Sequence, residues 1–176
     1  MNLTSKQIAL GGIFSALSLV FMILSGVLPL PYVMVFAAGF MVMLISAEVG
    51  IRAAFCAYVV VALLSLMLAP NRAMAVSFML FFGYYPLLKQ KLERLPTRKL
   101  EYACKVAVCV LSGALSTLAS LHLFGAAAAV GGLHEHGLPV LVGGTALGFF
   151  VYDFILTSFY TAYIRQLRPK IWGGAK

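Results

Sequence analysis

Long apolar stretches, separated by short polar or proline-containing breaks, make up most of the chain. The first three breaks contain Pro29 and Pro31, then Glu48-Val49-Gly50, then Pro70-Asn71-Arg72. A helix crosses the hydrocarbon core of a bilayer with about 20 residues, in a range of roughly 17–25. The pattern therefore predicts an all-α integral membrane protein, a six-transmembrane-helix bundle that forms one domain over residues 1–176. The predicted spans are about 8–28, 32–47, 51–69, 73–88, 102–124 and 139–164.

The composition agrees with a bilayer as the main solvent of this chain. Apolar side chains make up 62% of it and charged side chains 10%, and the mean hydropathy is +1.01. A soluble domain carries about 25% charged residues. So few charges cannot cover a water-facing surface, and the length leaves no room for a separate soluble catalytic domain.

The net charge of +8 suggests nucleic-acid binding only until its distribution is considered. If the N-terminus is cytoplasmic, twelve of the thirteen basic residues lie on the cytoplasmic side, and six of these fall between Lys89 and Lys105. Arg72 is then the one basic residue outside. An excess of Lys and Arg in cytoplasmic loops sets the orientation of membrane proteins. We expect a multi-pass cell-membrane protein with both termini cytoplasmic, surrounded by membrane lipids, and no nucleic-acid partner.

Asp153 is the main candidate for chemistry, because it lies within the sixth predicted span. A carboxylate at that depth costs at least about 2.5–3.5 kcal/mol, so it faces the interior of the bundle or a wet cavity. Thr157 follows four residues later and shares its helical face. Asp153 is either a ligand contact or proton site, or a buried hydrogen-bonded residue that holds helices together.

Polar residues on the outer side suggest a ligand site there. Asn71 and Arg72 occupy a predicted outer turn, and arginine suits planar anions such as carboxylates. The alternative for Arg72 is a contact with lipid headgroups. His122 lies at the outer end of the fifth predicted span, and His134 and His136 lie in the next loop. We predict no metal site, because the histidines have no thiolate nearby and two-residue spacing in a loop is common.

Small residues recur at a spacing that brings helix backbones close together. Gly12 and Ala16 are four residues apart in the first predicted span, and Ala53 and Ala57 are four apart in the third. Such pairs permit close helix packing in membranes. They serve either the internal packing of the bundle or contact with a partner subunit.

The segment Phe81–Lys89 ends the fourth predicted span and contains Pro86. Pro86 cannot donate a hydrogen bond to the carbonyl of Phe82, which predicts a kink. Tyr84 and Tyr85 fit the aromatic belt at a membrane interface, so this segment reads as an anchor. The polar loop is expected to begin at Lys89.

Motifs of soluble enzymes are absent from the chain. There is no Walker loop, no G-x-S-x-G and no H-E-x-x-H. We therefore predict that the chain is not an enzyme and holds no cofactor. A nucleotide site that powers transport would have to be on another chain.

The segment Ala9–Ser18 (ALGGIFSALS) opens the first predicted helix. With the six spans, internal termini and basic inner loops, it resembles the S components, the substrate-binding membrane subunits of energy-coupling factor (ECF) transporters. In that family a small-xxx-small motif docks on the transmembrane coupling subunit, and Gly12 with Ala16, and Ala53 with Ala57, match it. The resemblance implies a vitamin or other small micronutrient bound near the outer surface, and ATP hydrolysis by two partner ATPase subunits. The N-terminal histidine of the nickel and cobalt members is missing.

Two other functions remain open on the sequence. One is a small membrane scaffold subunit similar to the cell-shape protein MreD, and the other is an intramembrane enzyme. A scaffold needs neither an intramembrane acid nor a polar outer mouth, which favours a ligand-binding subunit. In the expected site Asn71 and Arg72 lie at the mouth, His122 lies on the outer side, and Asp153 with Thr157 forms the floor. An acidic group on the ligand would pair with Arg72.

Overall fold

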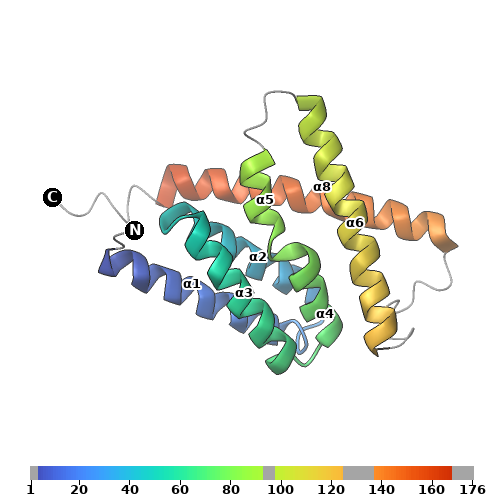
Figure 1. Cartoon of the computed structure of the whole chain (residues 1–176), viewed down its shortest axis with the longest axis horizontal. Coiled ribbons are helices and arrows are strands. Elements are labelled where there is room, and N and C mark those ends of the chain that lie inside the picture. The colour runs from blue at the N-terminus through green and yellow to red at the C-terminus, as the bar shows by residue number, and fades with distance from the viewer. Residues whose placement is uncertain (1–3, 93–97, 125–136, 168–176) are drawn as a thin grey trace.

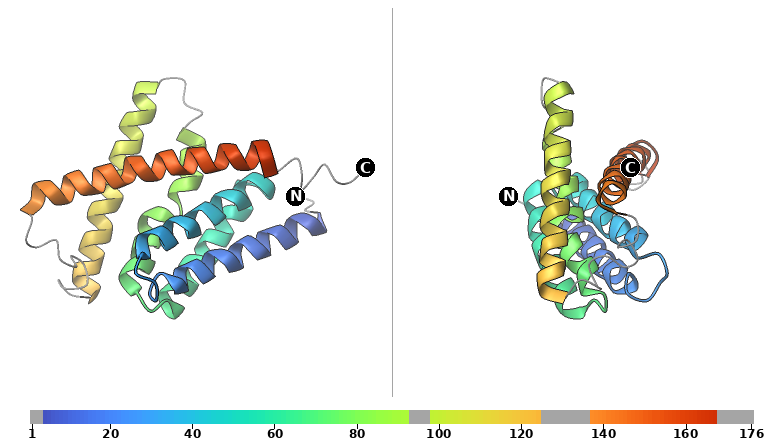
Figure 2. Two further views of the ribbon diagram at one scale, coloured as in Figure 1. Left: turned by 180° about the vertical axis from the view of Figure 1, so that it is seen from behind. Right: turned by 90° about the vertical axis from the view of Figure 1, so that its right-hand side faces the viewer.

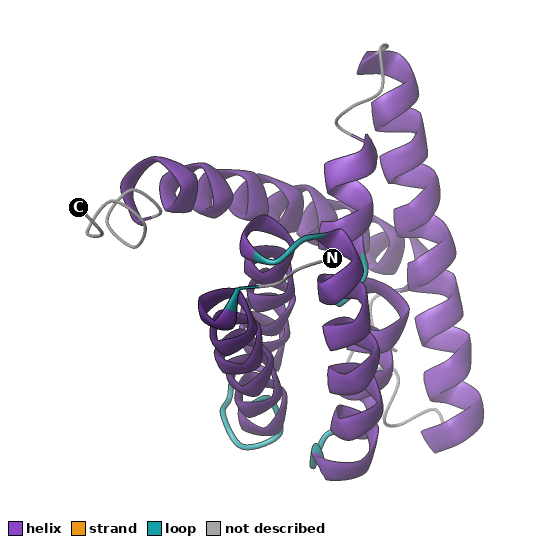
Figure 3. Ribbon diagram, turned by 60° about the vertical axis from the view of Figure 1, so that its left-hand side comes forward, coloured by secondary structure: helices purple, strands orange, loops and turns teal. Residues whose placement is uncertain are grey.

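The computed structural model describes residues 4–92, 98–124 and 137–167, and every regular element in these ranges is a helix (Figure 1; Figure 3). The all-α prediction is confirmed for this part of the chain. The elements, including two π-helices (η), are α1 Ser5–Leu24, α2 Pro31–Glu48, α3 Ile51–Leu68, α4 Arg72–Ser77, η1 Phe78–Phe82, α5 Tyr85–Leu92, α6 Arg98–Phe124, α8 Gly137–Ala162 and η3 Tyr163–Leu167.

Helices α1, α2 and α3 pack side by side and run in alternating directions (Figure 1). Each is long and apolar enough to cross a membrane, so the chain has at least three candidate spans within the described residues. Their bounds differ from the predicted spans by only a few residues. The central helix, α2, supplies much of the core through Val35, Ala38 and Val42, whereas α1 buries only Ser18 and Met22. The apolar outer face of α1 therefore suits contact with lipid or another protein.

Two glycines shape the connections among these three helices. Gly50 links α2 to α3 with φ +111°, a backbone conformation that side chains disfavour. Gly26, in the turn after α1, lies so close to the next turn that an added Cβ would be 2.8 Å from Cβ of Pro70. The α1–α2 and α3–α4 turns are thus at the same end of the molecule, as alternating spans require.

The fourth predicted span, 73–88, is a chain of three short helices. A π-helix, η1, follows α4, and the N–H of Gly83 donates to the carbonyl of Phe78 at 2.8 Å, five residues back. The chain then turns at Tyr84 and continues as α5 to Leu92. Where a kink was predicted near Pro86, the structure has a complete break at residues 83–84, and Pro86 lies in the first turn of α5. The prediction that a polar loop starts at Lys89 is wrong, because α5 extends one turn further.

Helices α6 and α8 cross each other steeply beside the first three helices (Figure 1; Figure 2). They correspond to the predicted spans 102–124 and 139–164, with the last residues of the latter forming η3. That they also span the membrane, completing a six-helix bundle, remains a prediction. The side chains of residues 98–102 and 137–147 are outside the described part of the structure.

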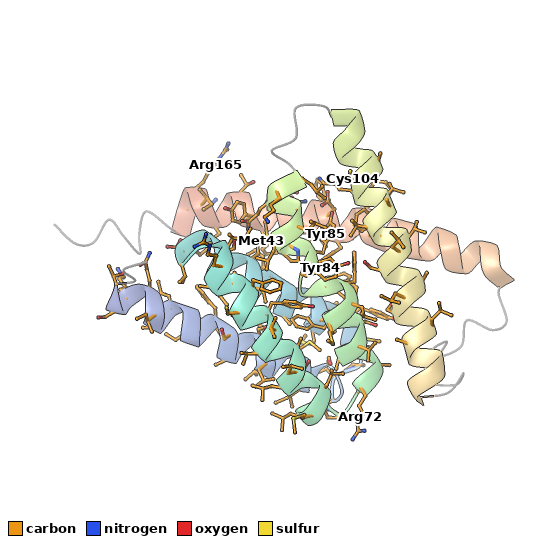
Figure 4. All side chains as sticks on the ribbon, in the orientation of Figure 1. Met43, Arg72, Tyr84, Tyr85, Cys104 and Arg165 are labelled. Carbon is orange, nitrogen blue, oxygen red and sulfur yellow. The ribbon has the colours of Figure 1, made fainter. Side chains whose placement is uncertain are left out.

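Hydrogen bonds bring the start of α1 and the end of the last helix to one end of the molecule. The Gln7 side chain donates to the carbonyl of Glu48 at 3.0 Å, and Oη of Tyr163 donates to Oε1 of Glu48 at 3.2 Å. Arg165 lies at this end and Arg72 at the opposite end (Figure 4). This placement suits termini on one side of a membrane, and the cytoplasmic assignment of that side remains a prediction.

Candidate functional site

The break between η1 and α5 leaves backbone carbonyls that two tyrosines from other helices satisfy. Pro86 has no N–H, and Oη of Tyr152 in α8 donates instead to the carbonyl of Phe82 at 3.1 Å. Oη of Tyr58 in α3 donates to the carbonyl of Met79 at 2.5 Å. An interrupted helix inside a membrane is stable only where such partners replace the lost bonds. Helix breaks of this kind frequently lie at functional sites.

Glycines let neighbouring elements come close to this break. A Cβ on Gly39 of α2 would be 2.5 Å from the carbonyl oxygen of Phe82 and 2.6 Å from Oη of Tyr152. A Cβ on Gly83 would be 2.6 Å from the ring of Tyr58. Neither position has room for a side chain, so the break is tightly fixed against α2 and α3.

One turn beyond the break, a charged cluster joins α5, α6 and α8. The Lys89 ammonium forms an ion pair with Oδ1 of Asp153 and donates to the hydroxyl of Thr157 at 2.7 Å. Oη of Tyr85 also donates to Oδ1 of Asp153 at 2.6 Å. Lys105 of α6 reaches Oδ2 at 3.4 Å. These five residues are called the Asp153 cluster below.

Three side chains of the Asp153 cluster are almost completely buried. Lys89 is 1% exposed, Lys105 5% and Tyr85 0%. Charges at such depth need close partners, because the desolvation cost otherwise exceeds the Coulombic gain. Asp153 accepts hydrogen bonds from two helices other than its own, which is the geometry expected of a residue that holds helices together. Its direct contact with a ligand remains a prediction.

Sequence reasoning placed three members of this cluster elsewhere. Lys89 and Lys105 were counted in the cytoplasmic charge balance and Tyr85 was assigned to an interface belt, whereas all three side chains are buried against other helices. The side of the membrane on which they lie remains a prediction. One signal was present in the sequence. Tyr85 and Lys89 are four residues apart, so a helix continuing past Lys89 puts both on one face.

A cavity of about 500 Å³, open along one side, lies beside the break, between α3, η1 and α6. It is lined by Tyr58, by Met79, Leu80 and Tyr84 at the break, and by the face of α6 between Leu111 and Leu118. The hydroxyls of Tyr84 and Ser112 form a hydrogen bond with each other at its wall. Its volume is within the range of about 300–1,000 Å³ typical of small-molecule sites.

The structure does not bring the predicted outer residues together with Asp153. Asn71 caps α4, its side-chain oxygen accepting from the N–H of Met74 at 3.2 Å, and Arg72 is exposed at the first position of α4. Arg72 lies at one end of the molecule, whereas Tyr85 of the Asp153 cluster lies in its middle (Figure 4). One small ligand cannot easily contact both.

The predicted histidines contribute little to the described geometry. His122 is in the last turn of α6, and its side chain is outside the described part of the structure. His134 and His136 fall in 125–136, which is also outside it. Among the residues whose placement is described, no group of three or more His, Cys, Asp or Glu side chains could hold a metal ion.

The predicted docking residues differ in their surroundings. Gly12 and Ala16 are exposed on α1, and a Cβ at Gly12 would have no neighbour within 4 Å. Ala53 and Ala57 on α3 are half-buried, and Ala57 packs against the core formed with α1 and α2. The α1 pair is therefore available to a partner, whereas the α3 pair is partly used within the chain.

No protein-family model, curated protein or solved structure matches this chain. The resemblance to S components accordingly rests on the residues of α1 and on the predicted topology. What the fold itself establishes is an all-helical chain, in its described part, with at least three helices suited to a membrane.

Proposed function

We propose that the chain is the substrate-capture subunit of an ATP-driven importer of the ECF type, and that it takes up a small organic micronutrient. In this proposal α1 docks on a transmembrane coupling subunit, and two ATPase subunits on other chains hydrolyse ATP. The chain binds the substrate and performs no chemistry on it. A membrane scaffold subunit and an intramembrane enzyme are the alternatives that the experiments below distinguish.

The exposed small-residue face of α1 is the observation that supports this proposal most. Gly12 and Ala16 are exposed, and large apolar side chains flank them, with Ile13 55% and Val20 46% exposed. A flat face of this kind lets a second backbone approach closely, which favours helix association in a bilayer. Because α2 and α3 cover only the opposite side of α1, a partner helix can reach this face without rearranging the chain.

The Asp153 cluster has a supporting part in this proposal. A subunit that binds a ligand and docks on a partner needs helices that stay fixed relative to one another. The cluster ties α8 to α5 and α6 through Lys89, Lys105 and Tyr85. We assign Asp153 and Thr157 to this role, and the substrate to the cavity beside the break.

Replacement of Ala16 by tryptophan tests the docking proposal. The indole ring would hold the two helices apart, and overpacking of a close contact costs about 1–3 kcal/mol, roughly a 5- to 150-fold loss of affinity. The measurement is co-purification of the coupling and ATPase subunits with the tagged chain from its own membranes. The variant should be recovered in normal amounts but with less of these partners.

Ala107→Trp is the matched control, because Ala107 is exposed on α6, outside the proposed docking face. This variant should retain the partners. Equal co-purification with Ala16→Trp and wild type would place the docking face elsewhere. Loss of partners with both variants would show that any bulky side chain added at the surface prevents association. The docking face could then no longer be assigned to α1.

A further inference from the structure

The residues that line the cavity beside the helix break favour an uncharged ligand. Three structural elements that are distant in sequence, α3, η1 and α6, form its walls. None of the described lining residues carries a charge, and most are Leu, Met or Ala. A charged ligand would lose its hydration here without gaining a counter-charge, which costs several kcal/mol.

The hydroxyls in the wall supply a small number of directional contacts. Tyr58 already donates to the carbonyl of Met79. Tyr84 and Ser112 share one hydrogen bond, and either can be its donor. A hydroxyl has one donor and two acceptor lone pairs, so this pair still has one O–H and several lone pairs to offer. A ligand with one hydroxyl or carbonyl group would find its partner there.

The open side of the cavity is bordered by exposed aliphatic side chains of α6. Leu111 is 71% exposed, Leu115 54% and Leu118 55%. On a helix that lies within a bilayer, these side chains face hydrocarbon rather than water. Entry from that side favours a molecule that already partitions into the membrane, because moving an ion into the hydrocarbon core is strongly unfavourable.

We propose that this cavity binds an uncharged, mainly apolar molecule that carries one hydroxyl or carbonyl group, which hydrogen-bonds to the Tyr84–Ser112 pair. The proposal names the substrate class of the importer and so rests on the proposed function. It differs from the expectation of an acidic ligand held by Arg72, because Arg72 is not among the described lining residues.

Photolabelling with a matched pair of benzophenones tests this proposal on the purified chain in phosphatidylcholine nanodiscs. The two probes are 4-benzoylbenzyl alcohol, which is neutral, and 4-benzoylbenzoate, which differs only in having a carboxylate. Peptide mass spectrometry locates the labelled residues, with labelling normalised to the amount of probe in the discs. The alcohol should label Met79 and the α6 segment 111–118 at least about tenfold more than the carboxylate does.

Three variants separate the cavity from an ordinary lipid-facing surface. Leu115→Trp should fill the cavity and abolish its labelling, whereas Val60→Trp, on the exposed face of α3 outside it, should have no effect. Ser112→Ala should lower labelling by the alcohol roughly 2- to 12-fold, the effect of one neutral hydrogen bond. The amount of folded chain in the discs is measured for each variant, so that a loss of labelling is compared at equal protein.

Three results would contradict the proposal. Equal labelling by both probes would show that charge is not selected against. Insensitivity to Ser112→Ala would mean that the cavity accepts apolar molecules, such as a lipid acyl chain, without using the hydroxyls of its wall. Labelling spread equally over α1 and α3 would mean that the cavity is not a specific binding site. Because no partner subunit is present, success here with failed docking at Ala16 would separate this site from the import function.

Discussion

Asp153→Ala is expected to lower the free energy of unfolding by about 3–5 kcal/mol, because it removes the carboxylate that the buried ammonium groups of Lys89 and Lys105 contact. Unfolding by sodium dodecyl sulfate in mixed micelles, followed by circular dichroism, measures this change. The second variant of a double-mutant cycle, Lys89→Met, should be similarly damaging. The double variant should be less unstable than the sum of the two, since the residues interact directly.

Lys91→Met is the control for the loss of a lysine from α5. Lys91 is exposed two residues beyond Lys89, and its replacement should change stability by no more than about 0.5 kcal/mol. If Asp153→Ala is as stable as wild type but binds ligand poorly, Asp153 contacts the ligand rather than holding helices together. That result would restore the site predicted from the sequence.

Gly39→Ala is expected to destabilise the chain by about 3 kcal/mol, the upper end of the usual range for overpacking. The added methyl group would overlap the carbonyl oxygen of Phe82 and the hydroxyl of Tyr152, which are hydrogen-bonded to each other. Because one of these atoms belongs to the backbone of the break, the clash cannot be relieved by a side-chain rotation alone. The same denaturation experiment measures this effect.

Gly12→Ala is the matched substitution at a position with open space. Nothing lies within 4 Å of the added carbon, so stability should be unchanged or slightly higher, given the better helix propensity of alanine. Equal tolerance of alanine at positions 39 and 12 would mean that α2 does not pack against the break as closely as the structure shows.

The sequence was most informative where structure depends on local pattern. Apolar runs and proline or glycine breaks placed α1, α2 and α3 to within a few residues, because helix ends follow from these local signals. A kink near Pro86 was also predictable, since a missing N–H acts on the residue four positions earlier. The π-helix that accommodates the break was not, because its geometry depends on Tyr58 and Tyr152 from distant helices.

The candidate sites were less predictable, because they depend on long-range contacts. Lys89 and Asp153 are 64 residues apart, and nothing in their spacing shows that they meet. Because Lys89 was counted among the charges of a cytoplasmic loop, its burial was not predicted. The cavity likewise joins residues of α3, η1 and α6 whose shared wall exists only after packing. Gly12 and Ala16 were easier to identify, since a four-residue spacing on one helix is local.

Native mass spectrometry of the tagged wild-type chain, released from its own membranes, tests the proposed import function most directly. The account predicts a complex that contains one further integral membrane protein and two ATPase subunits, together with a retained small uncharged organic molecule. The Ala16→Trp variant should release the partner chains but keep the small molecule. Recovery of the wild-type chain with structural membrane proteins alone, without an ATPase and without a bound small molecule, would contradict the import function and favour a scaffold.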